Sequence, residues 1–198
     1  SLYLVFHRAE EVGFIGACGA ALEEVIPEDA LVYSIEVSSY LARRGDDERV
    51  PLATPGAGPV IRTGDRATPA YDLEALCSLR EAALANPDLS VQQRFMWGGA
   101  CEASLYYAFG YRAAGICLPL LSAHNNGRAE GRECFVREGV NLSDLTGGTR
   151  LLVALARTVA DRPELSRHLG DHAVVAAHEE LRKRAEASLQ DCKAQGLI

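Results

Sequence analysis

Short apolar runs alternate along the chain with amphipathic stretches of helical period. The runs predict strands at 2–7, 31–37, 58–63, 91–96 and 114–120, and the amphipathic stretches predict helices at 15–24, 71–85, 101–109, 143–160 and 171–194. Most of the strand sequences are continuously apolar, as is typical of strands with helices on both faces. This alternation predicts an α/β fold, namely a three-layer sandwich with a mostly parallel central sheet.

The length and the apolar content predict a single domain over residues 1–198. The chain has 198 residues, 48% of them hydrophobic, which is enough for one substantial core. The one linker-like stretch, at 43–58, is expected to be a long polar loop. The sequence opens without Met inside "SLYLVF", which has the composition of a core strand, so we expect this chain to be the carboxyl-terminal part of a longer protein.

The charge balance and the cysteines narrow the class of protein. The net charge is −7 and no basic stripe stands out, so nucleic acid is not an expected partner. The six cysteines are scattered without a CxxC pair, which favours a reduced, cytoplasmic setting. No run of about twenty apolar residues and no signal peptide is found, so a membrane is not an expected partner either.

Residues whose side chains can act in catalysis or bind a metal ion follow three of the predicted strands. Glu10 and Glu11 come after the first, Glu36 ends the second, and His124 follows the fifth. In open α/β sheets ligands bind at the carboxyl ends of the strands, so we expect these four side chains to converge there. Carboxylates and imidazole suit Zn²⁺, Co²⁺ or Mn²⁺.

Each of these residues also has an ordinary structural interpretation. Adjacent glutamates are common on solvated surfaces, and a lone loop histidine such as His124 usually has no special role. Glu36 is the more unusual residue, because an acid inside "LVYSIEVSSY" would cost several kcal/mol to bury unless it is paired or bound to a metal. The occurrence of such residues at three strand ends together favours a site.

The segment "EEVGFIGA" resembles the glutamate-pair motif of the dinuclear zinc aminopeptidases, the superfamily that includes the tetrahedral, glutamyl and aspartyl aminopeptidases. Two further segments, "GAGPVIRTGDRATPAYD" and "MWGGACEAS", resemble the tetrahedral branch, so that the resemblance spans positions 2 to 157. It implies a metal-dependent aminopeptidase that removes amino-terminal residues from peptides. The implied cofactors are two divalent metal ions, Zn or Co, and the implied partners are a peptide substrate and copies of the chain in a homo-oligomer.

Matched position by position, the resemblance assigns a role to each of the four residues. Glu10 would be the general base, and Glu11, Glu36 and His124 would be metal ligands. The chain departs from the pattern in three places: Glu36 stands where the tetrahedral branch usually has Asp, "GGACEAS" places Cys101 and Glu102 where Thr-Asp is usual, and the family's earlier histidine and bridging aspartate precede the glutamate pair, before which this chain has nine residues. The resemblance therefore implies part of a site, and we expect the isolated chain to bind metal weakly and to be inactive.

Other interpretations of the sequence remain open. A non-catalytic relative of the same fold, acting as a peptide-binding or subunit-interaction module, would explain the altered "GGACEAS" turn. Cys101 could be a nucleophile beside His124, although no glycine-rich elbow surrounds it. Metal binding by His168 and His172 is disfavoured by the glycine between them, while His178 is expected at the edge of a helix's apolar face and His7 at a strand end.

Overall fold

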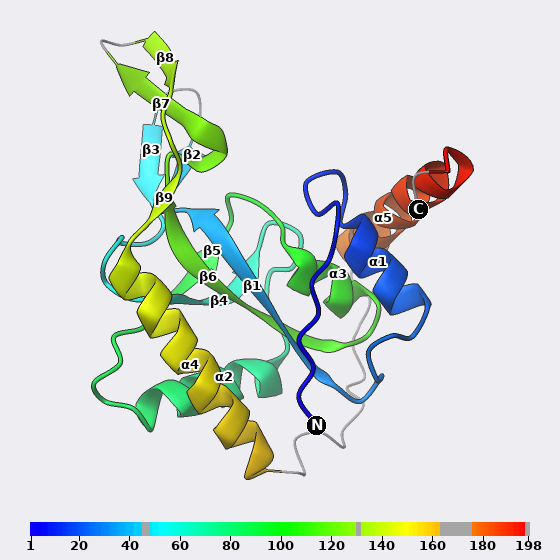
Figure 1. Cartoon of the computed structure of the whole chain (residues 1–198), viewed down its shortest axis with the longest axis horizontal. Coiled ribbons are helices and arrows are strands. Elements are labelled where there is room, and N and C mark those ends of the chain that lie inside the picture. Colours follow the sequence, from blue (N-terminus) through cyan, green and yellow to red (C-terminus); the bar gives the residue numbers. More distant parts are fainter. Residues whose placement is uncertain (45–47, 130–131, 163–175, 197–198) are drawn as a thin grey trace.

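A central sheet with helices on both faces organises the chain in the computed structural model, which describes residues 1–44, 48–129, 132–162 and 176–196 (Figure 1). The strands are β1 (Leu31–Ser39), β2 (Leu41–Arg44), β3 (Glu48–Pro51), β4 (Val60–Asp65), β5 (Gln92–Met96), β6 (Arg112–Leu121), β7 (Asn126–Ala129), β8 (Arg132–Phe135) and β9 (Gly139–Val140). The helices are α1 (Ile15–Leu22), α2 (Leu73–Leu84), α3 (Glu102–Ala108), α4 (Leu142–Ala160) and α5 (Ala176–Ala194), with a 3₁₀ turn η1 (Ala123–Asn125).

The sheet has the order β1-β6-β4-β5, with β9 beside the end of β6. β1 runs parallel to β6, and β4 runs parallel to β5. These two pairs meet antiparallel at β4 and β6, and β9 also pairs antiparallel with β6. Most of the paired residues therefore lie in parallel pairs, which confirms the predicted α/β fold with a mostly parallel central sheet.

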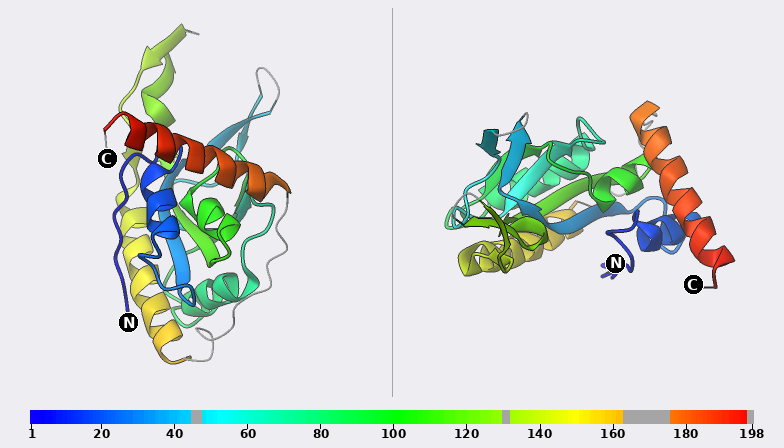
Figure 2. Two further views of the ribbon diagram at one scale, coloured as in Figure 1. Left: turned by 90° about the vertical axis from the view of Figure 1, so that its right-hand side faces the viewer. Right: turned by 90° about the horizontal axis from the view of Figure 1, so that it is seen from above.

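Burial on both faces of β6 explains why its sequence is apolar without alternation. Ile116 and its β4 neighbour Ile61 belong to one large core together with Leu79 of α2 and Leu151 of α4. α3 packs against β6 and β1, and α1 and α5 pack against α3. α1 and α5 lie together at one end of the molecule, whereas the β7–β8 hairpin projects at the other (Figures 1 and 2).

Side-chain caps account for where two of the helices begin. Asp72 precedes α2 and accepts a hydrogen bond from the backbone N–H of Ala75 at 2.8 Å. Asn141 precedes α4 and accepts from the N–H of Ser143 at 2.9 Å. Each cap satisfies a backbone donor that has no partner within its helix. Asp and Asn immediately before an amphipathic run are therefore start signals that can be read from the sequence.

The predicted strand at 2–7 is wrong. Residues 2–7 have no regular structure, and the side chains of Leu2 to Phe6 are 41% to 90% exposed. An isolated extended segment has no ladder hydrogen bonds, so its apolar composition alone does not make it a strand. In the structure this segment is fixed at its end, around His7 and Arg8, by contacts to helices.

The predicted polar loop at 43–58 is also wrong in part. β2 and β3 form an antiparallel hairpin there, with Leu41 opposite Pro51. Ala42, Leu52 and Ala53 form a small second core with Val60, Met96 and Cys117. The few apolar residues of this polar stretch thus pack on the sheet, which its average composition conceals.

The remaining boundaries agree closely with the sequence, with two exceptions. The predicted helix at 171–194 corresponds to α5, but its first residues, 171–175, lie outside the described residues. The β7–β8 hairpin, in which Asn126 pairs with Phe135, was not predicted. Among the described residues, no helix is both long enough and apolar enough to cross a membrane.

Replacement of Asp144 by Asn should destabilise the fold. The Asp144 carboxylate is fully buried at the start of α4 and accepts from the backbone N–H groups of Gly56 at 2.8 Å and Gly58 at 2.7 Å. An amide can accept only one of these bonds well, so we expect a loss of about 1–3 kcal/mol in the free energy of unfolding. Urea denaturation measures it, with the exposed Asp88→Asn as control; equal stability of the two variants would contradict this account of Asp144.

Candidate functional site

Glu10 and Glu11 lie in the loop that leads into α1. Glu10 is half-buried and Glu11 is exposed. The loop contains two non-glycine residues in the left-handed region, Ala9 and Phe14, both with φ of 59°. Such conformations are unfavourable by about 1–2 kcal/mol each and occur preferentially at functional sites. The backbone carbonyl of Glu10 accepts from the N–H groups of Gly13 at 3.1 Å and Phe14 at 2.9 Å, which closes the loop.

His124 lies in a second loop of this kind, directly after β6. Ser122, His124 and Asn125 all have left-handed backbone conformations, with φ between 54° and 58°. The His124 side chain is exposed, and its backbone N–H donates to Oε1 of Glu138 at 2.5 Å. Both loops that carry predicted site residues are therefore held in conformations that L-residues rarely adopt.

Glu36 lies within β1, on the face that α3 covers. Its Oε1 accepts a hydrogen bond from Ser34 Oγ at 3.4 Å, and its carboxylate also accepts one from the backbone N–H of Glu102. The pKa of Glu36 is raised to about 7, mainly by burial and in smaller part by the charges of Glu10 and Glu102, while Arg62 and the hydrogen bond from the Glu102 backbone lower it. The acid embedded in an apolar strand is thus largely buried, as its sequence context indicates.

The causes of the raised pKa of Glu10 indicate which of the predicted residues lie near it in the fold. Its pKa is raised first by burial and then by the charges of Glu11 and Glu102, while His124 and Arg62 lower it. Glu10 also acts on the pKa of Glu36. Residues from four separate parts of the sequence are therefore within electrostatic reach of Glu10.

Arg62, which the sequence did not single out, is the cation behind this group of acids. Its side chain is almost wholly buried, donating from Nη1 to Ser38 Oγ at 3.0 Å and from Nη2 to Asp65 at 3.4 Å. Its Nε has no hydrogen-bond partner among the residues that the structure describes. A Cβ at position 115 would lie 3.0 Å from Cδ of Arg62, so Gly115 of β6 makes room for this side chain.

Asp65 anchors Arg62 and the start of α3. Its carboxylate accepts hydrogen bonds from the Tyr71 hydroxyl at 2.7 Å, Ser104 Oγ at 2.7 Å and the backbone N–H of Cys101 at 3.0 Å. The Cys101 thiol is fully buried beside Tyr71, and burial raises its pKa to about 12. A thiol that stays protonated and inaccessible cannot attack a substrate, so the interpretation of Cys101 as a nucleophile is wrong.

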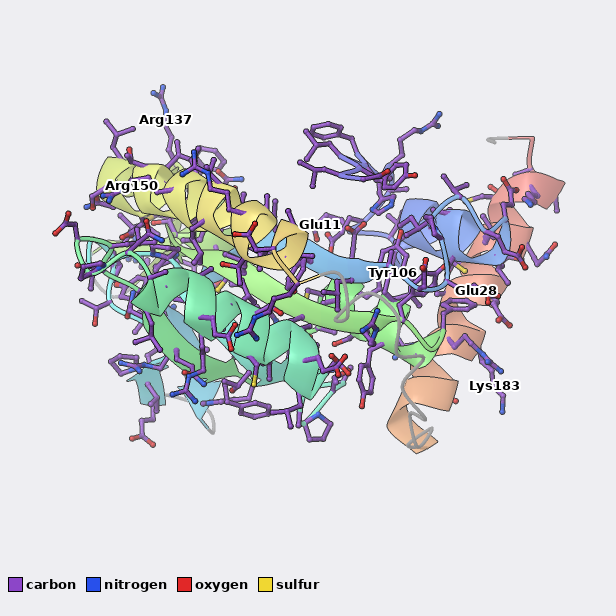
Figure 3. The ribbon with its side chains drawn as sticks, turned by 90° about the horizontal axis from the view of Figure 1, so that it is seen from below. Glu11, Glu28, Tyr106, Arg137, Arg150 and Lys183 are labelled. Atoms are coloured by element: carbon purple, nitrogen blue, oxygen red, sulfur yellow. The ribbon has the colours of Figure 1, made fainter. Side chains whose placement is uncertain are left out.

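A second polar network joins the amino-terminal segment to α3. His7 Nδ1 lies 3.0 Å from Oε2 of Glu102, and His7 Nε2 lies 2.8 Å from the hydroxyl of Tyr106. Tyr106 lies at the end of the molecule where α1 and α5 are found, whereas Arg137 and Arg150 lie at the other end (Figure 3). The sequence placed His7 at a strand end and gave Glu102 no role, because the contact spans 95 positions.

The donor chemistry of the site suits a divalent metal ion, but its geometry is incomplete. Among the residues that the structure describes, no three side chains of His, Cys, Asp or Glu are close enough to hold a metal ion. A catalytic zinc ion normally has three protein ligands. His168 and His172 lie outside the described residues, as does the side chain of His178. The described residues would therefore hold a metal ion only together with further ligands.

Comparison with solved structures identifies the fold. The chain is similar to an aminopeptidase from the archaeon Desulfurococcus kamchatkensis, with a TM-score of 0.58 and 23% identity over 85% of this chain and 44% of that one. It is also similar to a TET aminopeptidase from a marine sediment archaeon of the Thaumarchaeota, with a TM-score of 0.52 and 24% identity over 77% of this chain and 40% of that one.

A third similar structure is the TET1 peptidase of Pyrococcus horikoshii, described as assembling into a tetrahedron or a large octahedral shell. Its TM-score is 0.50, with 23% identity over 74% of this chain and 38% of that one. The chain spans less than half the length of each of these three proteins. Comparison with protein-family models and with curated proteins gives no match. The expected resemblance to the tetrahedral aminopeptidases is thus confirmed at the level of the fold.

The raised pKa of Glu36 predicts how the stability of the metal-free chain depends on pH. The folded chain holds this proton more tightly than the unfolded chain, so the stabilising contribution is complete below pH 4.5 and is lost as the pH rises through about 7. At about 1.4 kcal/mol per pKa unit, the loss is on the order of 3 kcal/mol. Glu36→Gln should remove this dependence and be more stable than the parent chain at about pH 8.

Urea denaturation of both chains across this pH range, with the exposed Glu28→Gln as control, measures the effect. The carboxyl ¹³C resonance of Glu36 should titrate in the same range. If Glu36→Gln and the parent chain kept a constant difference in unfolding free energy at all pH values, the buried state of Glu36 would be contradicted.

Proposed function

We propose that this chain, which has the fold of the TET aminopeptidases, carries part of the active site of a metal-dependent aminopeptidase. Glu10 is the general base in this proposal, and Glu11, Glu36 and His124 are ligands of one or both of two divalent metal ions, Zn or Co. The substrate is the amino-terminal end of a peptide. The remaining ligands come from outside the described residues.

The observation that carries the proposal is the electrostatic environment of Glu10. The residue that the resemblance makes the base is half-buried, and its carboxyl responds to the charges of both Glu11 and His124, two of the three proposed ligands. A general base must reach a water that is bound to the metal, but it must not bind the metal itself. A carboxylate that lies near the ligands, as Glu10 does, meets this requirement. The left-handed residues in both loops agree with this interpretation.

Each of the proposed residues would have a separate task. Bound metal ions supply an activated water of lowered pKa. Glu10, whose pKa is raised mainly by burial, is a stronger base than a free glutamate, and its carboxylate would accept a proton and return it to the leaving amine. Arg62 balances part of the negative charge behind Glu36, which favours the ionised form that a metal ligand requires.

The assembly and location of the protein belong to the same proposal. Because a similar peptidase is described as forming a tetrahedron or an octahedral shell, we propose that this chain also functions in a homo-oligomer. A cytoplasmic location is consistent with six cysteines that are all free in the structure.

A non-catalytic role is the second candidate, and one specific observation favours it. The residues that replace the usual Thr-Asp turn have structural partners here: the backbone N–H of Cys101 donates to Asp65, and the Glu102 carboxylate binds His7. A turn used in this way favours a peptide-binding or subunit-interaction module that keeps the fold without turning over peptides.

Metal titration distinguishes the two roles. The isolated chain should bind Zn²⁺ or Co²⁺ weakly, because the described residues offer an incomplete ligand set. Removing a ligand by Glu11→Gln, Glu36→Gln or His124→Ala should weaken this binding at least about tenfold, since even residues outside the first ligand shell change metal affinity by about 10–100-fold. Glu10→Gln and the exposed Glu28→Gln should leave it within about twofold.

Aminopeptidase activity is assayed in parallel on a panel of aminoacyl anilides with excess metal. We expect no measurable turnover from the isolated chain. Turnover that requires metal and disappears in Glu10→Gln would show that this chain alone builds a complete site, and the interpretation as a partial site would then be wrong. Metal binding that is equally strong in all of the variants would instead favour the non-catalytic module.

A further inference from the structure

The His7 imidazole joins the amino-terminal segment to α3 through both of its ring nitrogens. Its two ring nitrogens lie 3.0 Å from the Glu102 carboxylate and 2.8 Å from the Tyr106 hydroxyl, one helical turn apart on α3. The side chains of His7 and Glu102 are only 10% and 17% exposed. The imidazole and the Tyr106 ring are also in contact, with centroids 5.7 Å apart. A ring held at both nitrogens has a fixed orientation.

The backbone beside His7 is held by the first turn of α1. The N–H of Gly16 donates to the carbonyl of Arg8 at 3.0 Å, and the N–H of Ile15 donates to the carbonyl of Ala9 at 3.2 Å. These helix-start donors have no partner within α1, so the segment satisfies them. The approach is very close: a Cβ at position 16 would lie 2.6 Å from the Arg8 carbonyl oxygen and 3.1 Å from Cβ of His7.

The same turn of α3 also contacts Glu36. Glu102 receives His7 through its side chain and donates its backbone N–H to the Glu36 carboxylate. Glu10 follows His7 by three residues, across the strained Ala9. One residue of α3 therefore connects the loop that carries Glu10 with the strand that carries Glu36.

We propose that His7 is a positioning residue, which fixes the loop carrying Glu10 to the first turn of α3 and so sets the position of Glu10 relative to Glu36. The inference rests on the proposed function only for the role given to Glu10, because the attachment itself is a property of the fold. His7 does not touch the reacting groups in this arrangement. Its effect passes through the backbone of Arg8 and Ala9.

Proteolysis at Arg8 tests the attachment without any assay of activity. Arg8 is exposed, but both its carbonyl and that of Ala9 are hydrogen-bonded, so trypsin should cleave after Arg8 only when the segment detaches. His7→Ala removes both ring contacts and should raise the rate of cleavage at this bond at least about tenfold. His7→Asn keeps a donor near the position of Nδ1 and should restore part of the protection. Tyr106→Phe removes one contact and should have an intermediate effect.

Two glycines of α1 provide a matched pair. Gly16→Ala should push the segment away and raise cleavage after Arg8, because the added Cβ meets backbone atoms that cannot move aside independently. Gly19→Ala lies in the same helix, but its Cβ would meet only Leu189 Cδ1 at an ordinary 3.8 Å. Cleavage in Gly19→Ala should stay within about twofold of the parent chain, since alanine favours a helix over glycine.

The position of Glu10 is followed by its carboxyl ¹³C resonance, which should shift in His7→Ala and Gly16→Ala and not in Gly19→Ala. Cleavage after Arg94, in β5, measures general loosening of the fold. If cleavage after Arg8 and after Arg94 rose in parallel, or if the Glu10 resonance did not move, His7 would have a merely structural role and the inference would be wrong. Failure of the metal-binding and turnover experiments would contradict the proposed function and leave these results unaffected.

Discussion

The buried carboxylate of Asp65 is the point on which the arrangement of the site depends. It accepts six hydrogen bonds, which come from Arg62 and the N–H groups of the following turn, from Tyr71, and from Cys101 and Ser104 at the start of α3. Burying an isolated carboxylate costs much free energy. Here the six hydrogen-bond donors around Asp65 offset that cost. The same bonds set the position of α3 against the sheet, because β4 and α3 are not consecutive in the chain and only non-covalent contacts hold them together.

Because α3 is fixed in this way, its first turn can act on both sides of the site. The backbone N–H of Glu102 reaches Glu36 in β1, and its side chain reaches His7 in the amino-terminal segment. Arg62 extends the network in a third direction, to Ser38 beyond Glu36. The candidate site thus lies on a rigid polar layer between the sheet and α3, while its own residues lie on two strained loops and one strand. This combination of a rigid support and strained loops is typical of sites that perform chemistry.

At the candidate site, the negative charges of the acids are only partly balanced by nearby positive charge. The charge of Glu102 raises the pKa of both Glu10 and Glu36, and the charge of Glu10 also raises the pKa of Glu36, whereas Arg62 lowers both pKa values. Under the proposed function, a cation bound by Glu36 would offset part of this repulsion. The pKa of Glu36 is raised to about 7 chiefly by burial, and the charges of Glu10 and Glu102 contribute to the increase.

The sequence by itself determined the elements whose signals are local. The continuous apolar run of β6 indicated a strand that is covered on both faces, and Asp72 and Asn141 marked where α2 and α4 begin. The resemblance of "EEVGFIGA" and of two later segments to aminopeptidase motifs suggested the aminopeptidase fold. Tertiary structure decided the rest: the run at 2–7 is not a strand because strand formation requires a paired neighbour, and β4 runs against β6 because direction depends on how the chain crosses the sheet. Arg62, Asp65 and the His7–Glu102 pair were invisible in the sequence, since a buried polar residue is recognised only by the distant partners that satisfy it.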